Sequence, residues 1–233
     1  MGGAALVAGF VLWRLVLTQG YQARGRELVA RAGRLPREYT VGEGRLLRMV
    51  VLGDSTAAGV GASSLEATLP YRVAVGLGGT IRVTNLAVSG ATLGDVVADQ
   101  LPRVPQNADL LLVSATANDA TKGRSPSDVQ DDLRRLIQGL TERGTKRIVL
   151  STTPNFRTTP ALPVLMNRLF GRRAEGMTLM LRRMAVREPN VRLADLYHEG
   201  TLSEEQYAAD GFHPNDAGYT AWAEVFLLAV RQR

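Results

Sequence analysis

The stretch Leu46-Leu47-Arg48-Met49-Val50-Val51-Leu52-Gly53-Asp54-Ser55 decides the fold that this sequence predicts. Residues 46–52 form a nearly continuous apolar run, which is typical of a strand buried on both faces of a parallel sheet. The run ends in glycine, aspartate and serine, so polar groups follow directly where the strand is expected to end. The stretch therefore predicts a central strand with a turn after it that can carry chemistry.

Further apolar runs and helical patterns alternate along the rest of the chain. The runs are residues 81–88, 110–113, 147–150 and 191–196, and the helical patterns are residues 69–77, 93–104, 127–143, 177–187 and 215–230. Strands that alternate with helices indicate an α/β fold whose parallel sheet is covered on both faces. We therefore expect five parallel strands, with functional residues at their carboxyl ends.

Composition excludes several classes of protein. With 233 residues, 45% of them hydrophobic and 21% charged, the chain fits one folded domain with modest additions. The absence of cysteine excludes disulfide frameworks and cysteine nucleophiles, and His198 and His213 are too few for most transition-metal sites. We expect no metal, and any histidine chemistry must use one of these two residues.

The net charge of +6 is concentrated in two segments. Residues 1–40 and residues 165–190 each hold six arginines against two glutamates. Such patches suit an anionic surface, such as lipid headgroups or nucleic acid, or are simply solvated helix faces. Aromatic residues make up only 6% of the chain, too few for a base-stacking surface, so no nucleic-acid partner is expected.

Ser55 stands in a position that suits a nucleophile. A serine just beyond a buried strand, in the glycine-rich turn 53–61, places its hydroxyl at the carboxyl edge of the sheet and its N–H near a helix start. The alternative is that Asp54 or Ser55 only caps the next helix. A phosphate loop is excluded because no Gly-Lys-Ser/Thr follows, and Ser64 breaks the dinucleotide-binding pattern.

A second motif, Asp210-Gly-Phe-His213, lies near the C-terminus. A separation of three residues lets both side chains share one turn, so the carboxylate can hold Nδ1–H while Nε2 takes a proton from a serine. Pro214 favours extended backbone at His213 and a helix start directly afterwards. The alternative is a capping aspartate beside a surface histidine.

Two other turns after predicted strands offer hydrogen-bond donors. Gly90 can present its backbone N–H, and Asn118 can present its side-chain amide. Acyl transfer needs such donors where negative charge develops on the carbonyl oxygen. Each turn alone is ordinary, but these motifs follow one another at the ends of successive strands.

In these motifs the sequence resembles the SGNH hydrolases, the GDSL family of esterases and lipases, over about residues 46–231. The residues that carry the resemblance are Gly53-Asp54-Ser55, Gly90, Asn118-Asp119 and Asp210-x-x-His213. The resemblance implies a flavodoxin-like three-layer α/β/α fold, a small-molecule ester as substrate and no cofactor.

The resemblance also implies a role for each site residue. Ser55 would be the nucleophile, His213 the base and Asp210 the acid that orients it. The oxyanion hole would consist of the N–H groups of Ser55 and Gly90 and the side chain of Asn118.

One position departs from the family pattern. Thr116 stands where the family usually has glycine, two residues before Asn118. A β-branched residue tolerates a positive φ poorly and adds bulk. Either the loop that carries Asn118 differs, or the acyl pocket is narrowed.

The N-terminus is apolar. Residues 2–13 have no polar side chain, and Leu15–Leu17 follow Arg14. The run is shorter than the ~20 residues of a membrane span and lacks a basic segment before it. It is an interrupted signal anchor, an interfacial helix or a helix docked on the domain, and we favour membrane association through residues 2–17. The side of the membrane stays open.

These observations predict two parts, an N-terminal segment and basic connector (1–44) and a catalytic domain (45–233). The function expected is a serine esterase that acts through an acyl-enzyme, on a lysophospholipid or a short-chain lipid ester. Alternatives are a carbohydrate O-acetyl esterase, which a narrowed pocket would favour, and a catalytically silent, membrane-tethered binding module. Residues 156–184 are expected to form either a cap over the acyl pocket or an ordinary helical connection.

Overall fold

The computed structural model describes residues 19–232 and contains one mixed sheet in this range. The strands are β1 (Glu38–Val41), β2 (Leu46–Gly53), β3 (Thr80–Asn85), β4 (Leu110–Ser114), β5 (Ile148–Ser151) and β6 (Val191–Ala194). Their order is β1-β3-β2-β4-β5-β6. Strands β2 to β6 run parallel, and β1 pairs antiparallel with β3 at the edge.

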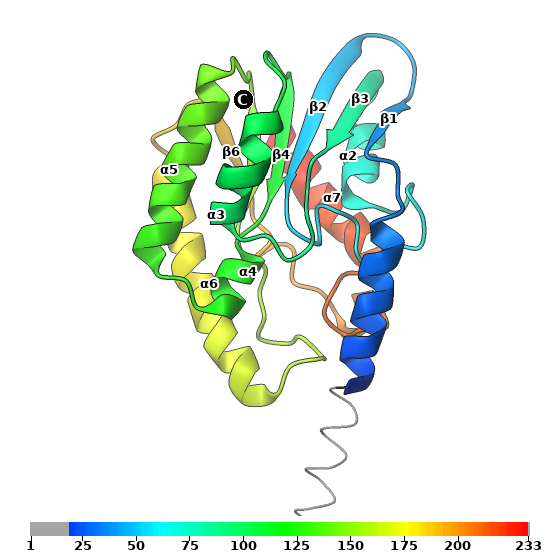
Figure 1. Cartoon of the computed structure of the whole chain (residues 1–233), viewed down its shortest axis with the longest axis vertical. Coiled ribbons are helices and arrows are strands. Elements are labelled where there is room, and N and C mark those ends of the chain that lie inside the picture. The colour runs from blue at the N-terminus through cyan, green and yellow to red at the C-terminus, as the bar shows by residue number, and fades with distance from the viewer. Residues whose placement is uncertain (1–18, 233) are drawn as a thin grey trace, which may run out of the picture.

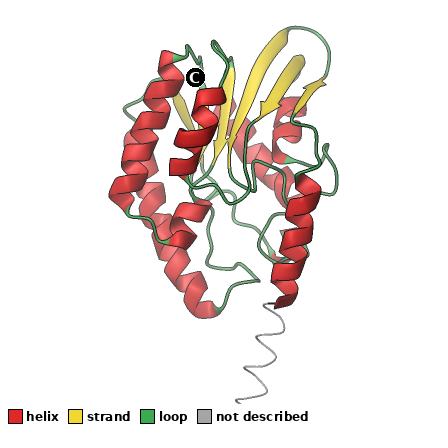
Figure 2. Cartoon of the chain, in the orientation of Figure 1, coloured by secondary structure: helices red, strands yellow, loops and turns green. Residues whose placement is uncertain are grey.

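Helices cover both faces of this sheet (Figures 1 and 2). One face packs against α2 (Leu69–Leu77) and α7 (Asp216–Arg231), and the other against α3 (Leu93–Asp95), α4 (Ala117–Lys122), α5 (Pro126–Glu142) and α6 (Val164–Ala185). Side chains of β2 alternate between the two cores, with Met49 and Val51 in one and Val50 and Leu52 in the other. This confirms the expected three-layer α/β/α fold.

The five expected parallel strands are present as β2 to β6, and the sheet has one additional strand that the sequence did not predict. The additional strand, β1, is short and half exposed, with only Val41 fully buried, so it lacks the apolar run that marks the central strands. It also precedes residue 45, so the sheet extends into the segment that we expected to be a connector. The sequence signal that remains is a weak two-residue alternation, with Tyr39 and Val41 facing inward.

Two helices also differ from their predicted form. Residues 93–104 divide into α3, a π-helical turn (Val96–Gln100) and a 3-10 turn (Leu101–Arg103), because Pro102 has no N–H to donate to an α-helical bond. Helix α6 begins at Val164, well before residue 177. It lies over the sheet as the connection between β5 and β6, so residues 164–185 form an ordinary crossover helix, the second of the two alternatives for this segment.

Residues 19–32 are helical and dock on the domain. Leu28 and Ala32 are buried in a small cluster with Val60. The apolar residues 2–17, on which the expected membrane contact depends, lie outside the described residues. Among residues 19–232, no helix is both long enough and apolar enough to cross a membrane.

The order of the strands places the functional region. The chain runs from β2 to β3 on one side and then returns past β2 to β4 on the other side. Such a switch point opens a crevice at the carboxyl ends of the strands. Ser55 follows the end of β2 and therefore lies at this crevice.

Candidate active site

Ser55, His213 and Asp210 form a continuous chain of hydrogen bonds. The Oγ of Ser55 lies 2.9 Å from Nε2 of His213, and Nδ1 of the same ring lies 2.5 Å from Oδ2 of Asp210. Asp210 is buried, whereas the edge of His213 is partly accessible. In the chain, His213 lies 158 residues after Ser55 and Asp210 lies 155 residues after it. The structure brings the three residues together in the arrangement that activates a hydroxyl.

The turn 210–213 fixes the imidazole ring. The second oxygen of Asp210 accepts hydrogen bonds from the N–H groups of Phe212 and His213, both at 3.0 Å. Burial acts to raise the pKa of Asp210, but the hydrogen bonds from the His213 ring and from these N–H groups outweigh it and hold the pKa below its ordinary value. A charged Asp210 is thus available to orient the ring and to stabilise its protonated form.

Asp54, beside Ser55, is a buried carboxyl that the site does not pair with a cation. Its Oδ1 accepts hydrogen bonds from N–H and Oγ1–H of Thr56, at 2.9 and 2.8 Å. Among residues 19–232, Oδ2 has no hydrogen-bond partner. Burial raises the pKa of Asp54 to about 6, although the bonds from Thr56 oppose this.

Asp54→Asn is expected to remove a pH-dependent loss of stability, so that the variant gains on the order of 2 kcal/mol relative to the unaltered chain between pH ~4 and pH ~7. Below pH ~4 the carboxyl is neutral in both the folded and the unfolded chain. Between pH ~4 and the folded pKa of about 6 the unfolded chain loses the proton first, so the free energy of unfolding falls as the pH rises. Denaturant unfolding of both proteins at pH 4, 5, 6 and 8 measures the two free energies of unfolding. A difference between them that is constant over this range would contradict a raised pKa of Asp54.

Gly90 and Asn118 lie on two segments that are tied to each other. Gly90 has a φ of +85°, which suits glycine and leaves its peptide at the surface. Asn118, in the first turn of α4, donates from Nδ2 to the carbonyl oxygen of Ala91 at 3.0 Å. The structure thus brings together these two predicted donors at the ends of β3 and β4.

Two further residues of α4, for which the sequence predicted no role, hold the same loop. Lys122 donates from Nζ to the carbonyl oxygen of Gly90 at 2.8 Å, and the buried Asp119 accepts the N–H of Leu93 at 3.0 Å. Asp119 is fixed in turn by Arg124 at 2.9 Å. The available signal was spacing, because residues 118 and 122 lie on one face of a helix.

Gln100 is a third residue that the sequence did not mark. From the π-helical turn it accepts the N–H of Gly53 at 2.9 Å and donates to the carbonyl oxygen of Gly53 at 2.8 Å. It is almost completely buried. These two bonds fix the residue from which the Asp54-Ser55 turn begins, and a break in helical periodicity at Pro102 is the only trace in the sequence.

Thr116 adopts the conformation expected of the family's glycine, with a φ of +80°. Its side chain is completely buried, and its Oγ1 lies 2.7 Å from Oγ1 of Thr153. The loop therefore keeps its left-handed geometry at the cost of backbone strain in a β-branched residue. The alternative expectation, a threonine that narrows the acyl pocket, loses its basis because this side chain has no exposed surface.

Thr116→Gly is therefore expected to leave the preference for acyl chain length unchanged. The substitution removes a side chain that faces Thr153 rather than the crevice. Relative kcat/KM values over a series of p-nitrophenyl esters measure this. A shift towards longer chains would show that Thr116 does border the substrate.

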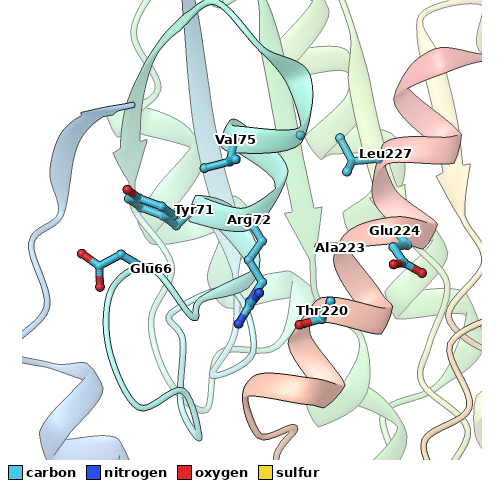
Figure 3. Close-up of a pocket in the computed structure, with 9 residues that line it drawn as sticks. Glu66, Tyr71, Arg72, Val75, Thr220, Ala223, Glu224 and Leu227 are labelled. Carbon is cyan, nitrogen blue, oxygen red and sulfur yellow. The ribbon is translucent and has the colours of Figure 1, made fainter. Parts of the chain in front are cut away.

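Other polar groups and hollows lie apart from this constellation. His198 is half exposed and pairs with Asp195 at 3.1 Å, as a surface histidine does. A hollow of about 320 Å³ lies between α2 and α7, with Val75 and Leu227 on either side and none of the site residues in its lining (Figure 3). Within residues 19–232, no group of three or more His, Asp or Glu side chains is arranged to hold a metal ion.

The fold and the Ser-His-Asp chain define a class of protein, an α/β/α domain in which the serine after the central strand is hydrogen-bonded to an Asp-His pair. The profile of the GDSL-like Lipase/Acylhydrolase family matches residues 51–221. The chain belongs to this family, as the sequence motifs suggested.

Individual relatives agree with this family. The chain is 28% identical to a GDSL-like esterase of Mycobacterium tuberculosis over 199 residues, covering 79% of this chain and 62% of the relative, which is less than two thirds of that protein. It is 25% identical to an arylesterase of Vibrio mimicus, covering 72% and 80% of the two chains. The solved structure of a lipase from a goat rumen metagenome has the same fold, with a TM-score of 0.66, 19% identity and coverage of 80% and 99%.

Proposed function

We propose that this protein hydrolyses carboxylic esters through an acyl-enzyme on Ser55. The observation that carries the proposal is the chain of hydrogen bonds from Ser55 through His213 to the charged Asp210. Family membership supports it, because the relatives of Mycobacterium tuberculosis and Vibrio mimicus are named as esterases. A catalytically silent module is disfavoured, since neither the nucleophile, the base nor a donor is missing.

In the first half of the reaction, Nε2 of His213 takes the proton of Ser55 as Oγ attacks the ester carbonyl carbon. The carbonyl oxygen becomes an oxyanion, which the N–H groups of Ser55 and Gly90 and the amide of Asn118 stabilise. Asp210 stabilises the protonated ring. His213 then gives its proton to the departing alkoxide, and the alcohol leaves an acyl group on Ser55.

The second half uses the same residues with water. His213 takes a proton from the water as its oxygen attacks the acyl carbon, and the oxyanion forms in the same place. The bond to Ser55 breaks, and His213 returns the proton to Oγ. The acid is released and the free serine is restored.

An aromatic row beside the imidazole supports an apolar substrate. Phe212, next to His213, stacks on Phe156 with ring centroids 5.9 Å apart, and Phe156 contacts Phe170 edge-on at 6.3 Å. Phe212 and Phe170 are only partly buried, so they offer apolar surface near the reacting atoms. This favours a lysophospholipid or a short-chain lipid ester over an acetylated carbohydrate, whose case depended on a pocket narrowed by Thr116.

The proposal is tested by measuring kcat/KM on p-nitrophenyl esters from acetate to palmitate. Turnover of at least part of the series is expected, with a preference for acyl chains longer than acetate because the aromatic row adds buried apolar area. A best substrate of acetate would contradict the lipid ester. No turnover of any member would contradict the reaction itself.

We also propose that residues 2–17 contact a membrane surface, since the run is apolar and arginines follow it. Deletion of residues 1–18 is expected to release the protein from vesicles and to leave turnover of a soluble ester within a few-fold. The cut is placed before residue 19 because the following helix contacts the site turn, where Arg24 donates to the carbonyl oxygen of Ala209 at 3.3 Å. Vesicle sedimentation and p-nitrophenyl acetate assays check both parts, and equal vesicle binding of both proteins would refute the contact.

A further inference from the structure

The first two turns of α6 expose apolar side chains to solvent. Val164 is 61% exposed, Leu165 70% and Leu169 39%. Arg168 and Arg172 are exposed between and after them. We call these five residues the α6 edge. Buried residues of α6 begin at Gly171, so these first turns expose leucine and valine, interspersed with arginine, on a helix that packs on the domain further along.

The α6 edge lies at the same end of the molecule as the start of the described chain. With the longest axis vertical, the beginning of α6 and the beginning of the N-terminal helical segment both lie at the lower end (Figure 1). The apolar residues 2–17 precede residue 19 in the sequence.

The turn that contains Asp210 and His213 lies between the start of α6 and the N-terminal helical segment and is hydrogen-bonded to both. On one side, the N–H of Ala161, just before α6, donates to the carbonyl oxygen of Gly211 at 3.0 Å. On the other side, Arg24 of the N-terminal helical segment holds the carbonyl oxygen of Ala209. The site turn thus lies between the two segments that reach the lower end.

An apolar path leads from the α6 edge to the imidazole. Phe170 follows Leu169 directly in α6 and contacts Phe156, which stacks on Phe212 beside His213. Phe170 and Phe212 are partly exposed, and Phe156 between them is buried, so these ring contacts join α6 to the residue beside the imidazole.

We propose that the α6 edge docks on a membrane with anionic headgroups, so that ester substrates reach Ser55 from the lipid phase. This inference rests on the proposed function for its last step. A lipid surface is the partner favoured, because it accepts valine and leucine among its acyl chains while its phosphates pair with the interspersed arginines.

The test uses the full chain and sedimentation with vesicles of phosphatidylcholine, alone or with phosphatidylglycerol. Leu165→Glu is expected to weaken binding to the mixed vesicles at least about tenfold, since it removes apolar contact and adds repulsion from the headgroups. Arg168→Gln is expected to weaken binding to mixed vesicles only. The matched control is Leu228→Glu, a leucine 56% exposed on α7 near its C-terminal end, whose binding is expected to stay unchanged.

Hydrolysis is measured in parallel on a soluble ester and on an ester embedded in the vesicles. Leu165→Glu is expected to keep turnover of the soluble ester, which also shows that it folds, and to lose turnover of the embedded ester in step with binding. The inference is overturned if the unaltered chain binds neither vesicle, if Leu165→Glu binds as the unaltered chain does, or if Leu228→Glu loses as much. Failure of the proposed function is a different result, namely no soluble turnover by the unaltered chain.

Discussion

Ser55→Ala and His213→Ala are each expected to lower kcat for ester hydrolysis by on the order of 10⁴ to 10⁶. Without the hydroxyl no acyl-enzyme forms, and without the imidazole the proton on Oγ has no acceptor at 2.9 Å. Because the two groups act as one unit, the double variant is expected to be little slower than either single one. Single-turnover and steady-state rates on one p-nitrophenyl ester measure all three.

Each variant is compared with the unaltered chain by its thermal unfolding, so that a loss of fold is separated from a loss of chemistry. Ser55→Ala removes one hydroxyl, so a similar midpoint is expected. A single variant that is folded and keeps more than about a tenth of the activity would exclude this serine mechanism.

Asn118→Ala is expected to lower kcat by about 10² to 10³ with a much smaller effect on KM. A donor aimed at the developing oxyanion stabilises the transition state more than the bound substrate. The side chain also donates to the carbonyl oxygen of Ala91, so the thermal midpoint is expected to fall by the equivalent of ~1 kcal/mol. Kinetics and melting curves on the same preparation separate the two effects.

Lys122→Met is the matched control for Asn118→Ala. Lys122 holds the carbonyl oxygen of Gly90 in the same loop but offers no side-chain amide to the site. If Asn118 acts only as a tether of the loop, both substitutions should lower kcat to the same extent. Normal turnover in Asn118→Ala with a lowered midpoint would rule out its role as an oxyanion donor.

The fold could be predicted where buried strands and helices show as apolar patterns in the sequence. Strands β2, β4 and β5 are apolar over most of their length because both faces are covered, and their runs identified them. Strands β3 and β6 include polar residues and were identified from shorter apolar stretches. Strand β1 could not be found in this way, because an edge strand with one covered face needs few apolar residues. The early start of α6 was missed because its first turns expose leucine and valine among arginines instead of showing one buried stripe.

The site residues that stand in local motifs could be predicted, whereas those that act through distant contacts could not. Ser55, Asp210 and His213 stand in short motifs whose local geometry follows from spacing, and the structure joins them by hydrogen bonds. Lys122 and Gln100 act on loops that are 32 and 47 residues away in the chain. Such contacts depend on how strands and helices pack, so the spacing of Lys122 and the break at Pro102 do not show which distant backbone group each residue holds.

The most direct test of the central claim, that Ser55 is the nucleophile, is covalent labelling with a fluorophosphonate followed by peptide mass mapping. The phosphorus is attacked by an activated serine oxygen and fluoride leaves, so the adduct records which hydroxyl is activated. We predict one adduct per chain, on Ser55, formed in parallel with the loss of esterase activity and absent from Ser55→Ala. An adduct on another residue, or full hydrolysis by a chain completely labelled at Ser55, would contradict the account.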